Sequence, residues 1–376
     1  MVTSSPLNRR RWLQLSGSAM LGLALASKTR LRAQHEVSRS SRSTEIARVN
    51  GNENPYGPSQ MAVMAMMENL EQTFRYATRP EVERLTELIV AKEGVKPEQI
   101  VLGVGSGEIL QTVGLWLGAK GGEIVTVTPG YTQMTRTAER AGAKIVNVPL
   151  TKELVHDLDA MAAKVTDRTT CVYLCNPNNP TGTVVDPAKL KPFVEEMSKR
   201  CLVFVDEAYL ECSDNFEANT MAPVVATGAN VIVARTFSKI YGLAGQRIGY
   251  GLLPESMVET VRSFSTGSLN KLAVTAAIAS LEDVAYVDDT RQKIKEQRDA
   301  LCAVLDSLGR KCAQPQGNFV FFQTGMPIKM FQERMLAERV MVGREFPPML
   351  DWCRISIGSP EEMAQVHAAL RKVLAA

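Results

Sequence analysis

Six short runs of mostly apolar and β-branched residues constrain the fold of this chain more than any other feature of its sequence. Because each run is nearly all apolar, each is expected to be buried on both faces of a sheet. Stretches long enough for a crossover helix, such as residues 131–143 and 186–200, lie between several of them. The pattern predicts a mostly parallel α/β sheet built from EIVTVTP (123–129), AKIVNVP (143–149), TTCVYLCNP (169–177), CLVFVDEAY (201–209), NVIVARTFSK (230–239) and RIGYGLLP (247–254).

The pattern changes from about Ala273 onward. It becomes helical through residues 294–309, and two strand-like runs follow, GNFVFFQT (317–324) and CRISIGS (353–359), with a helical stretch between them. A chain of 376 residues with 45% hydrophobic content can bury one large core and a smaller second one. We therefore expect a large domain at 75–270, a smaller α+β domain at 271–376, and an N-terminal arm at 49–74 that joins the small domain.

The first 34 residues are expected to be an export signal. Three arginines at 9–11 precede Trp12, and an uncharged, small-residue apolar stretch runs to Ala26, as in a secretory signal. The pattern resembles a twin-arginine signal, although Asn8 and Gln14 depart from it. Residues 35–48 are interpreted as a linker. This predicts a periplasmic protein. The alternative is a disordered basic arm followed by an ordinary amphipathic helix, in a protein that stays in the cytoplasm.

Charge and cysteine content exclude several classes of function. The net charge is only +3 and part of the excess lies in the N-terminal segment, so the body lacks the basic field that nucleic-acid binding needs. No apolar run of membrane-spanning length follows that segment. The seven cysteines and three histidines lack the paired spacings of a zinc site, so we expect mostly buried thiols and no metal.

Polar side chains stand directly after three of the predicted strands. Asn179 comes shortly after CVYLC of the third run, Asp206 follows LVFV in the fourth, and Ser238 and Lys239 follow VIVARTF in the fifth. In an open parallel sheet, ligands bind beyond the carboxyl ends of the strands. An amide, an acid and an amine are therefore expected to meet at one edge.

This combination of groups suits pyridoxal 5′-phosphate. The Lys239 amine can form a Schiff base with the aldehyde if burial keeps part of it neutral, and the freed amine can then act as general base. Asp206 facing the pyridine nitrogen would keep that nitrogen protonated, so that the ring accepts electrons from the substrate carbon. The phosphate needs an arginine, hydroxyls and the free N–H groups of a helix start, which Arg247, Ser238 and the segment VGSGEIL (104–110) can supply.

Six motifs together resemble the fold-type I pyridoxal-phosphate aminotransferases, and most closely the histidinol-phosphate aminotransferase group. They are NENPYGPS, VGSGEIL, NPNNPTG, DEAY, SKIYGLAGQRIGY and RISIG, and they cover the chain from about Val49 to its end. The resemblance implies an α/β fold with a large and a small domain, and a homodimer. It also implies a ping-pong transfer of an amino group from an amino acid, or an amino-alcohol phosphate, to a 2-oxo acid.

The resemblance assigns roles to individual residues. Lys239 forms the Schiff base, Asp206 faces the ring nitrogen, Asn179 and Tyr209 face the 3-oxygen, and Tyr131 stacks on the ring. Lys239, Asp206 and Tyr209 are the catalytic set. The phosphate is bound by Ser106, Gly107, Ser238 and Arg247, and Glu108 is grouped with the cofactor-binding residues. Arg354, Arg344 and Asn54 bind the substrate, and Tyr56 is contributed by the other subunit.

Some of these residues have structural alternatives. Arg354 could form a structural ion pair, Arg344 could be a solvated charge at a strand end, and Asn54 and Tyr56 could form a proline-containing turn. The family often has an acidic residue in place of Gly107, and a Tyr-Pro pair where this chain has Tyr76 and Ala77.

Three functions remain open at this point. The first is an aminotransferase. The second is a relative on the same scaffold, such as a decarboxylase, β-lyase or oxidase, and the third is a binding protein without turnover. Because histidine is made in the cytoplasm, the export signal favours a periplasmic aminotransferase of unknown amino donor over the biosynthetic enzyme.

Overall fold

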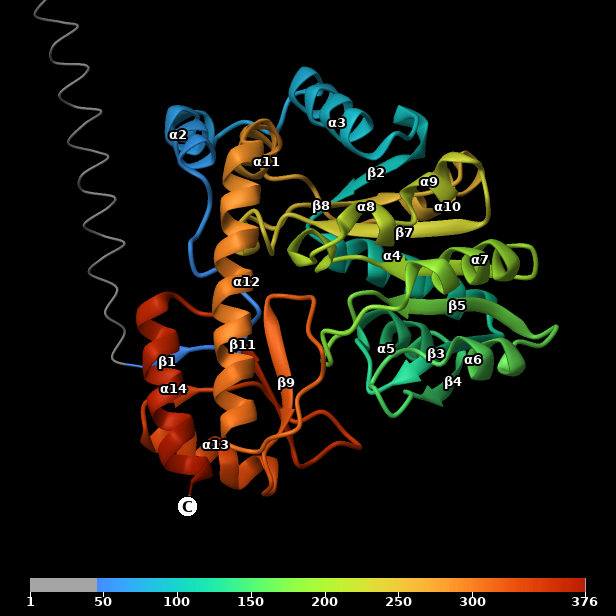
Figure 1. Ribbon diagram of the computed structural model, residues 1–376. Coiled ribbons are helices and arrows are strands. Elements are labelled where there is room, and N and C mark those ends of the chain that lie inside the picture. Colours follow the sequence, from blue (N-terminus) through green and yellow to red (C-terminus); the bar gives the residue numbers. More distant parts are fainter. Residues whose placement is uncertain (1–45, 376) are drawn as a thin grey trace, which may run out of the picture. The chain divides into compact units, whose positions relative to one another are not determined.

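The six apolar runs form neighbouring strands of one seven-stranded sheet in a computed structural model, which describes residues 46–375 (Figure 1). The order is β2-β8-β7-β6-β5-β3-β4, and only β8 runs antiparallel to its neighbours. The predicted mostly parallel sheet is confirmed. The strands are β2 (Ile100–Gly103), β3 (Glu123–Thr128), β4 (Lys144–Pro149), β5 (Thr169–Cys175), β6 (Leu202–Asp206), β7 (Val231–Thr236) and β8 (Gly249–Leu252).

Two details of the sheet differ from the prediction. Strand β4 lies at the edge of the sheet and pairs only with β3, so most of its residues are partly or fully exposed, although burial on both faces was expected. At the other edge, β2 was not predicted as a strand. It has four residues and leads directly into the glycine-rich segment VGSG.

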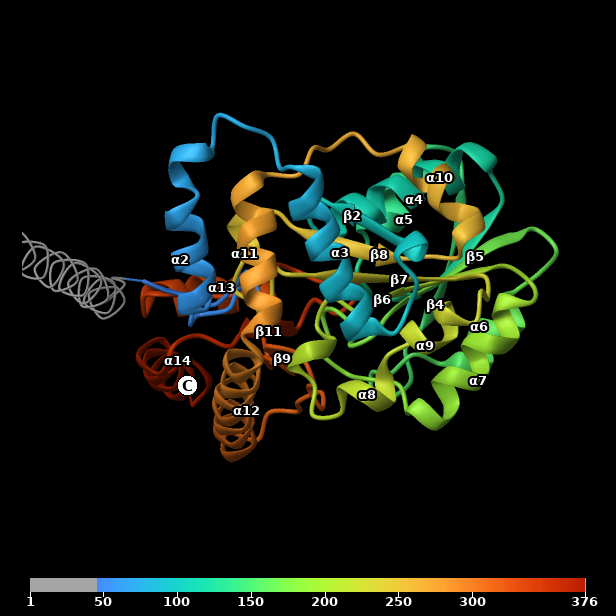
Figure 2. The same ribbon diagram turned by 90° about the horizontal axis from the view of Figure 1, so that it is seen from above.

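Helices cover both faces of this sheet. Successive residues of a strand point to opposite faces and so pack in different cores. In β6, Val203 and Val205 pack in the core on one face, and Leu202 and Phe204 pack in the core on the other. One face packs on α4 (Ser106–Lys120), α5 (Gln133–Arg140) and α10 (Glu255–Ser263). The opposite face packs on α3 (Arg79–Glu93), α6 (Leu158–Lys164), α7 (Pro187–Ser198) and α9 (Ala222–Ala226), and Figure 2 shows α4 and α10 on one side of the strands and α7 and α9 on the other.

The remaining elements come from both ends of the described chain. Strand β1 (Ala47–Arg48) pairs in parallel with β10 (Val340–Met341), and β9 (Phe319–Gln323) pairs antiparallel with β11 (Trp352–Ser356). The helices here are α2 (Gln60–Glu68), α11 (Lys271–Glu282), α12 (Val284–Ser307), α13 (Ile328–Ala337) and α14 (Pro360–Leu374).

The short helical elements lie along the chain between the longer ones. They are α8 (Phe216–Asn219), η1 (Leu70–Gln72), η2 (Pro97–Gln99), η3 (Leu210–Cys212) and η4 (Ala244–Gln246). The domain bounds at 74 and 270 stay a prediction.

Several helices start and end where the sequence carries capping residues. The N-caps Thr78 and Ser359 form capping boxes with Glu81 and Glu362, which satisfy otherwise unpaired N–H groups at the starts of α3 and α14. Gly94 ends α3 in the left-handed conformation, with a φ of +67° that favours glycine. These local signals fix the helix bounds independently of the core.

The predicted signal 1–34 and residues 35–45 of the predicted linker lie outside the described residues. No helix in the described part is long and apolar enough to cross a membrane. All seven cysteines are free, five of them buried and two half-buried. Within residues 46–375, His, Cys, Asp and Glu side chains nowhere form a group of three that could hold a metal ion.

Candidate active site

The polar residues that follow β5, β6 and β7 meet at one edge of the sheet, as expected for parallel strands. The amide of Asn179 donates to the Tyr209 hydroxyl over 3.0 Å, and the Lys239 Nζ lies 5.2 Å from the centre of the Tyr209 ring. Burial raises the pKa of Asp206 to about 6, and the positive charge of Lys239 is close enough to oppose part of that rise. The structure therefore brings together the predicted amide, acid and amine.

Lys239 is held in a site that favours its neutral form. Burial, and then the nearby positive charge of Arg354, lower its pKa from 10.5 to about 8. Its Nζ donates to the backbone carbonyl of Asn52 over 3.1 Å. A larger share of this amine is therefore unprotonated at neutral pH than for an exposed lysine, as attack on an aldehyde requires.

Asp206 is a buried carboxylate without an ion-pair partner among residues 46–375. It is 1% exposed, and burial raises its pKa from 3.8 to about 6. Oδ2 lies 3.4 Å from the Tyr173 hydroxyl and 3.9 Å from the Cys175 thiol, and Oδ1 accepts from the Ala208 N–H over 3.2 Å. An unpaired buried charge is costly. A protonated ring nitrogen would supply the missing cation, so this acid fits pyridoxal phosphate.

The start of α4 forms a cradle for an anion. This 15-residue helix begins at Ser106, and the N–H groups of its first turn lack the partners that later residues of a helix have. Next to this helix start, Arg247 donates to the Ser238 hydroxyl over 3.2 Å. A Cβ on Gly105 would lie 2.4 Å from the Arg247 Nη2, and one on Gly249 would lie 2.4 Å from the Ser106 nitrogen. These glycines let the cationic and N–H groups approach, and the set fits the cofactor phosphate.

Arg247 itself has an unusual backbone conformation. Its φ of +57° lies in the left-handed region, which non-glycine residues rarely adopt. Such conformations cluster at functional sites. Here it allows the exposed guanidinium to turn back onto Ser238 and the Val104 carbonyl.

A hydrogen-bonded chain joins Tyr209 to Arg354. The Arg354 Nη1 donates to the Asn179 Oδ1 over 2.7 Å, and the same amide donates to the Tyr209 hydroxyl. Arg354 lies on β11, is 7% exposed and pairs with no carboxylate among the described residues, and its Nε lacks a hydrogen-bond partner. The structural ion pair considered for Arg354 is therefore not found in this part of the chain.

Tyr131 and Arg344 lie near this chain. Burial, and then the Asp206 charge, raise the pKa of Tyr131 to about 12, and its hydroxyl donates to Gln133 over 2.7 Å. Arg344 is exposed, and its guanidinium lies 4.4 Å from the centre of the Phe346 ring, whereas that of Arg354 lies 5.0 Å from the same ring. Two guanidinium groups thus approach one aromatic ring.

Three predicted site residues make side-chain contacts outside the group formed by Asn179, Asp206 and Lys239. The Glu108 carboxylate accepts from the Ser265 hydroxyl and from three backbone N–H groups, so it holds segment 265–267. Asn54 donates to the Ile240 carbonyl over 2.7 Å and accepts from the Tyr56 N–H, which is the turn considered above. Tyr56 lies against α12, 5.5 Å from the Lys293 Nζ. Their roles toward ligands stay predictions, and Gly107 lies within the first turn of α4.

Asn52 contacts several site residues, although no role was predicted for this first residue of the motif NENPYGPS. Its amide donates to the Tyr209 hydroxyl over 3.2 Å, its carbonyl accepts from Lys239 and Asn318, and its side chain accepts from Ser356 over 2.8 Å. Its φ of +53° is one that asparagine tolerates better than most residues. The sequence feature that could have indicated a special backbone position here is an asparagine next to Gly51.

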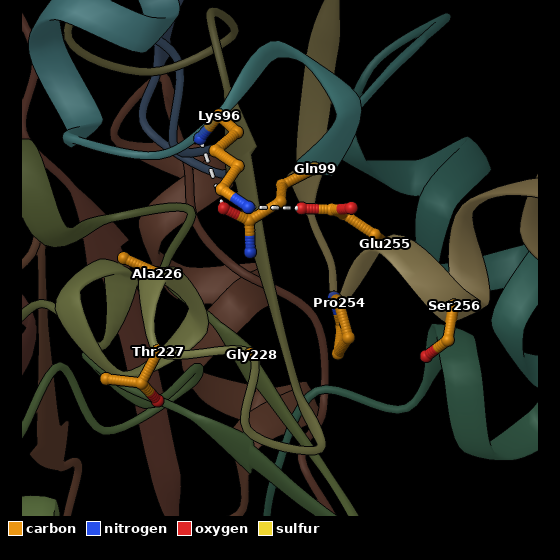
Figure 3. Close-up of a pocket in the computed structure, with 8 residues that line it drawn as sticks. All are labelled: Lys96, Gln99, Ala226, Thr227, Gly228, Pro254, Glu255 and Ser256. Carbon is orange, nitrogen blue, oxygen red and sulfur yellow. Dashed lines mark hydrogen bonds and ion pairs between the residues drawn. The ribbon is translucent and has the colours of Figure 1, made fainter.

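A surface cavity of about 250 Å³ lies apart from these residues (Figure 3). It is lined by Lys96, Gln99, Ala226, Thr227, Gly228, Pro254, Glu255 and Ser256, and Lys96 and Glu255 form an exposed ion pair there at 2.8 Å. The residues at the carboxyl ends of β5, β6 and β7 do not line it, so the candidate active site is defined by the side chains at that edge.

Comparison with known proteins agrees with this geometry. The family model "Aminotransferase class I and II" matches residues 44–370. Histidinol-phosphate aminotransferase of Moorella thermoacetica is 37% identical over 90% of this chain and 88% of its own length, and that of Brevibacillus brevis is 34% identical over 88% and 91%.

Solved structures show the same likeness. A structure from Erwinia carotovora atroseptica has a TM-score of 0.83 and 32% identity over 87% of this chain and 95% of its own. Histidinol-phosphate aminotransferase from Sinorhizobium meliloti, solved with pyridoxal-5′-phosphate, has a TM-score of 0.76 and 27% identity over 88% and 91%. The chain therefore belongs to the class I and II aminotransferase family and is a pyridoxal-phosphate-dependent aminotransferase of the fold-type I class.

Proposed function

We propose that Lys239 and Asp206 carry the chemistry of this aminotransferase. Pyridoxal phosphate, when bound, supplies an aldehyde that captures the substrate amine and a ring that accepts electrons from the substrate α-carbon. Asp206 holds the proton on the ring nitrogen. The Lys239 Nζ removes the proton from the substrate α-carbon, and the pKa of about 8 supports this role because a neutral amine is a base.

The other residues of the site bind and orient. Ser106, Ser238 and Arg247 would hold the phosphate, supported by the cradle at the start of α4. The amide of Asn179 and the hydroxyl of Tyr209 would bind the 3-oxygen. Tyr131 would stack on the ring and help to shield it from water.

The amino donor is proposed to carry an anionic group, either carboxylate or phosphate, that binds Arg354. The observation that supports this is the buried Arg354 guanidinium without a carboxylate partner among residues 46–375. Burial lowers the pKa of Arg354, so a bound anion would offset the free energy cost of burying this positive charge. The Arg344 guanidinium, which lies against the same Phe346 ring, is proposed to strengthen the positive potential that attracts this anion. Since the relatives above are named histidinol-phosphate aminotransferases, histidinol phosphate is the first donor to test.

Replacing Arg354 with glutamine is expected to lower kcat/KM for an anionic donor by about 10- to 100-fold, the worth of a hydrogen bond to a charged group. The measurement compares histidinol phosphate with histidinol, which lacks the anionic phosphate, each with 2-oxoglutarate, in the wild type and in Arg354→Gln. Arg344→Gln is the matched control and is expected to have a smaller effect, because that arginine is solvated. An equal loss for the donor with the phosphate and the donor without it would show that Arg354 only shapes the site.

We further propose that the enzyme is a homodimer. Large apolar side chains are exposed on α2 and the segment after it, with Phe74 76% and Tyr76 85% exposed, and exposed Met61, Met67 and Leu70 extend this surface. Monomeric proteins rarely leave such a patch uncovered, so a second copy of the chain is its proposed partner. In this proposal Tyr56 is contributed across the interface. Sedimentation equilibrium measures the mass of the assembly directly.

The proposed location is the periplasm, reached by the twin-arginine route after folding and cofactor loading. The support is the arginine run at 9–11 with the uncharged stretch up to Ala26. Arg9→Lys combined with Arg10→Lys is expected to retain active enzyme in the cytoplasm, whereas wild-type activity fractionates with the periplasm. The matched control is Arg30→Lys, outside the motif. Wild-type activity in the cytosol with an intact N-terminus would contradict export and favour histidine synthesis as the role.

A further inference from the structure

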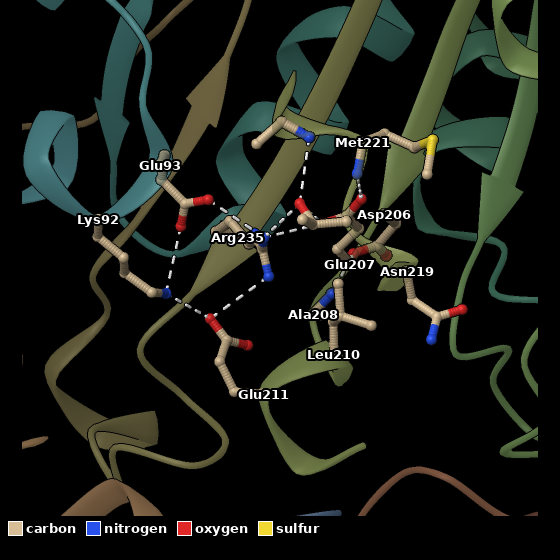
Figure 4. A network of polar contacts seen from close by, with 12 residues as sticks. Lys92, Glu93, Asp206, Glu207, Ala208, Leu210, Glu211, Asn219, Met221 and Arg235 are labelled. Carbon is tan, nitrogen blue, oxygen red and sulfur yellow. Dashed lines mark hydrogen bonds and ion pairs between the residues drawn. The ribbon is translucent and has the colours of Figure 1, made fainter. Parts of the chain in front are cut away.

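A cluster of buried charges lies next to the ends of β6 and β7, apart from the residues that would touch the cofactor (Figure 4). It consists of Lys92, Glu93, Glu207, Glu211 and Arg235, and we call it the buried charge cluster. Arg235 lies at its centre, with ion pairs of 3.0 Å to Glu207, 3.2 Å to Glu93 and 3.6 Å to Glu211. Lys92 closes the cluster with ion pairs to Glu211 at 2.9 Å and to Glu93 at 3.2 Å.

The cluster is connected to the active site through two short pieces of chain. Glu207 directly follows Asp206, and Arg235 precedes Lys239 by four residues. Asp206 pairs with Ala234 in the sheet, so the chain leaves β6 and β7 side by side. The Glu207–Arg235 ion pair therefore joins the segment that carries Asp206 to the segment that carries Lys239.

Other elements anchor the cluster. Glu207 accepts from the Met221 N–H over 2.7 Å and from the Thr220 hydroxyl over 3.2 Å. Arg235 donates to the same Thr220 hydroxyl over 2.9 Å, and the Tyr250 hydroxyl of β8 donates to Glu93 over 2.6 Å. The pair is therefore fixed by the segment before α9, by the end of α3 and by β8.

Maintaining this arrangement is costly. Arg235 and Glu207 are each 0% exposed, and the cluster has three carboxylates for two cations. The Arg235 Nε and Nη1 have no hydrogen-bond partner. Buried ion pairs seldom stabilise a fold better than apolar side chains of the same size would. Stability is thus a weak reason for a cluster beside these strand ends, and fixed geometry is a better one.

We propose that Glu207 and Arg235 are positioning residues, which hold Asp206 and Lys239 at the separation that one cofactor requires. The inference rests on the roles proposed above for Asp206 and Lys239. Neither positioning residue touches the reacting atoms. Both act by fixing where the chain leaves β6 and β7, and small displacements of catalytic groups lower rates strongly.

The test replaces Glu207 with glutamine, which keeps the shape and removes the charge that pairs with Arg235. We expect a normal content of bound pyridoxal phosphate, little change in KM, and a kcat per bound cofactor lowered by about 10- to 100-fold. The pH midpoint of the visible absorption of the cofactor at Lys239 is expected to shift, because Asp206 and Lys239 are no longer held at the same separation. Glu207→Asp, which retains the charge, is expected to recover part of kcat and of the midpoint.

The matched control is Glu81→Gln, which removes the partner of another buried cation, Lys271, between α3 and α11. Thermal unfolding of the cofactor-free proteins reports stability, and both variants are expected to unfold at a lower temperature. Only Glu207→Gln should change kcat and the pH midpoint. If Glu207→Gln does not fold, Arg235→Lys is measured with the same expectation, since it keeps the charge and loses the planar fork.

Two results would overturn the inference. A folded Glu207→Gln or Arg235→Lys variant with lower thermal stability, but with the wild-type kcat and pH midpoint, would give the cluster a purely structural role. Loss of bound cofactor with normal kcat per remaining cofactor would do the same. If the Lys239→Ala variant still catalyses transamination at the wild-type rate, the proposed function is contradicted, and the inference with it.

Discussion

Replacing Lys239 with alanine is expected to lower the rate of amino transfer by at least about 10⁴-fold, because the variant loses its general base as well as the amine that attaches the cofactor. The structure supports this through the half-buried position of Lys239, its lowered pKa of about 8 and its place three residues after the end of β7. Rates are measured with saturating donor and 2-oxoglutarate, after reconstitution with pyridoxal phosphate.

Chemical trapping identifies the attachment site in the same samples. Borohydride reduction of the wild type, followed by peptide mapping, is expected to give a pyridoxyl adduct on the peptide that contains Lys239, and Lys239→Ala should lack it. Lys271→Ala, at a lysine that is buried elsewhere in the fold, is the matched control and should retain the adduct. An adduct on a different lysine in the wild type would show that the attachment site is misassigned.

Replacing Asp206 with asparagine is expected to lower kcat by about 10³-fold, on the scale of removing one preorganised electrostatic group. A neutral amide cannot keep the ring nitrogen protonated, so the substrate α-carbon becomes less acidic when Lys239 removes its proton. Cofactor content should remain close to that of the wild type, since the phosphate cradle at α4 is unchanged. Absorbance measures the cofactor content, and steady-state kinetics measure kcat.

Asp206→Glu is the matched control for this effect. It keeps a carboxylate at the end of β6 and is expected to recover part of the rate, because the charge is retained although its position changes. Near-normal turnover in Asp206→Asn would mean that another acid faces the ring nitrogen.

The parallel sheet could be predicted because β-branched runs separated by helical stretches have few other solutions. The carboxyl-end rule then placed Asn179, Asp206 and Lys239 together, and the structure confirms that they meet. Strand β2 was not predicted, and β4 was taken for a buried strand because an apolar run does not reveal that it lies at an edge.

The remaining parts of the site depend on contacts between distant segments. Asn52 and Ser356 meet although 304 positions separate them, and no local pattern encodes that contact. Glu108 was grouped with the cofactor because it stands in a phosphate-binding motif, but its carboxylate is occupied by the segment 265–267. Local motifs predict which groups are present, and tertiary packing decides where the longer side chains point.

One half-reaction tests most directly whether the enzyme transfers an amino group and catalyses no other reaction of its donor. The cofactor-loaded enzyme is mixed with ¹⁵N-labelled histidinol phosphate, or another anionic donor that it accepts, without any 2-oxo acid. One equivalent of carbonyl product per subunit is expected, with the label retained on the enzyme, and the label should pass to glutamate when 2-oxoglutarate is added. Release of carbon dioxide or free ammonia, or no product from any donor that carries an anionic group, would contradict it.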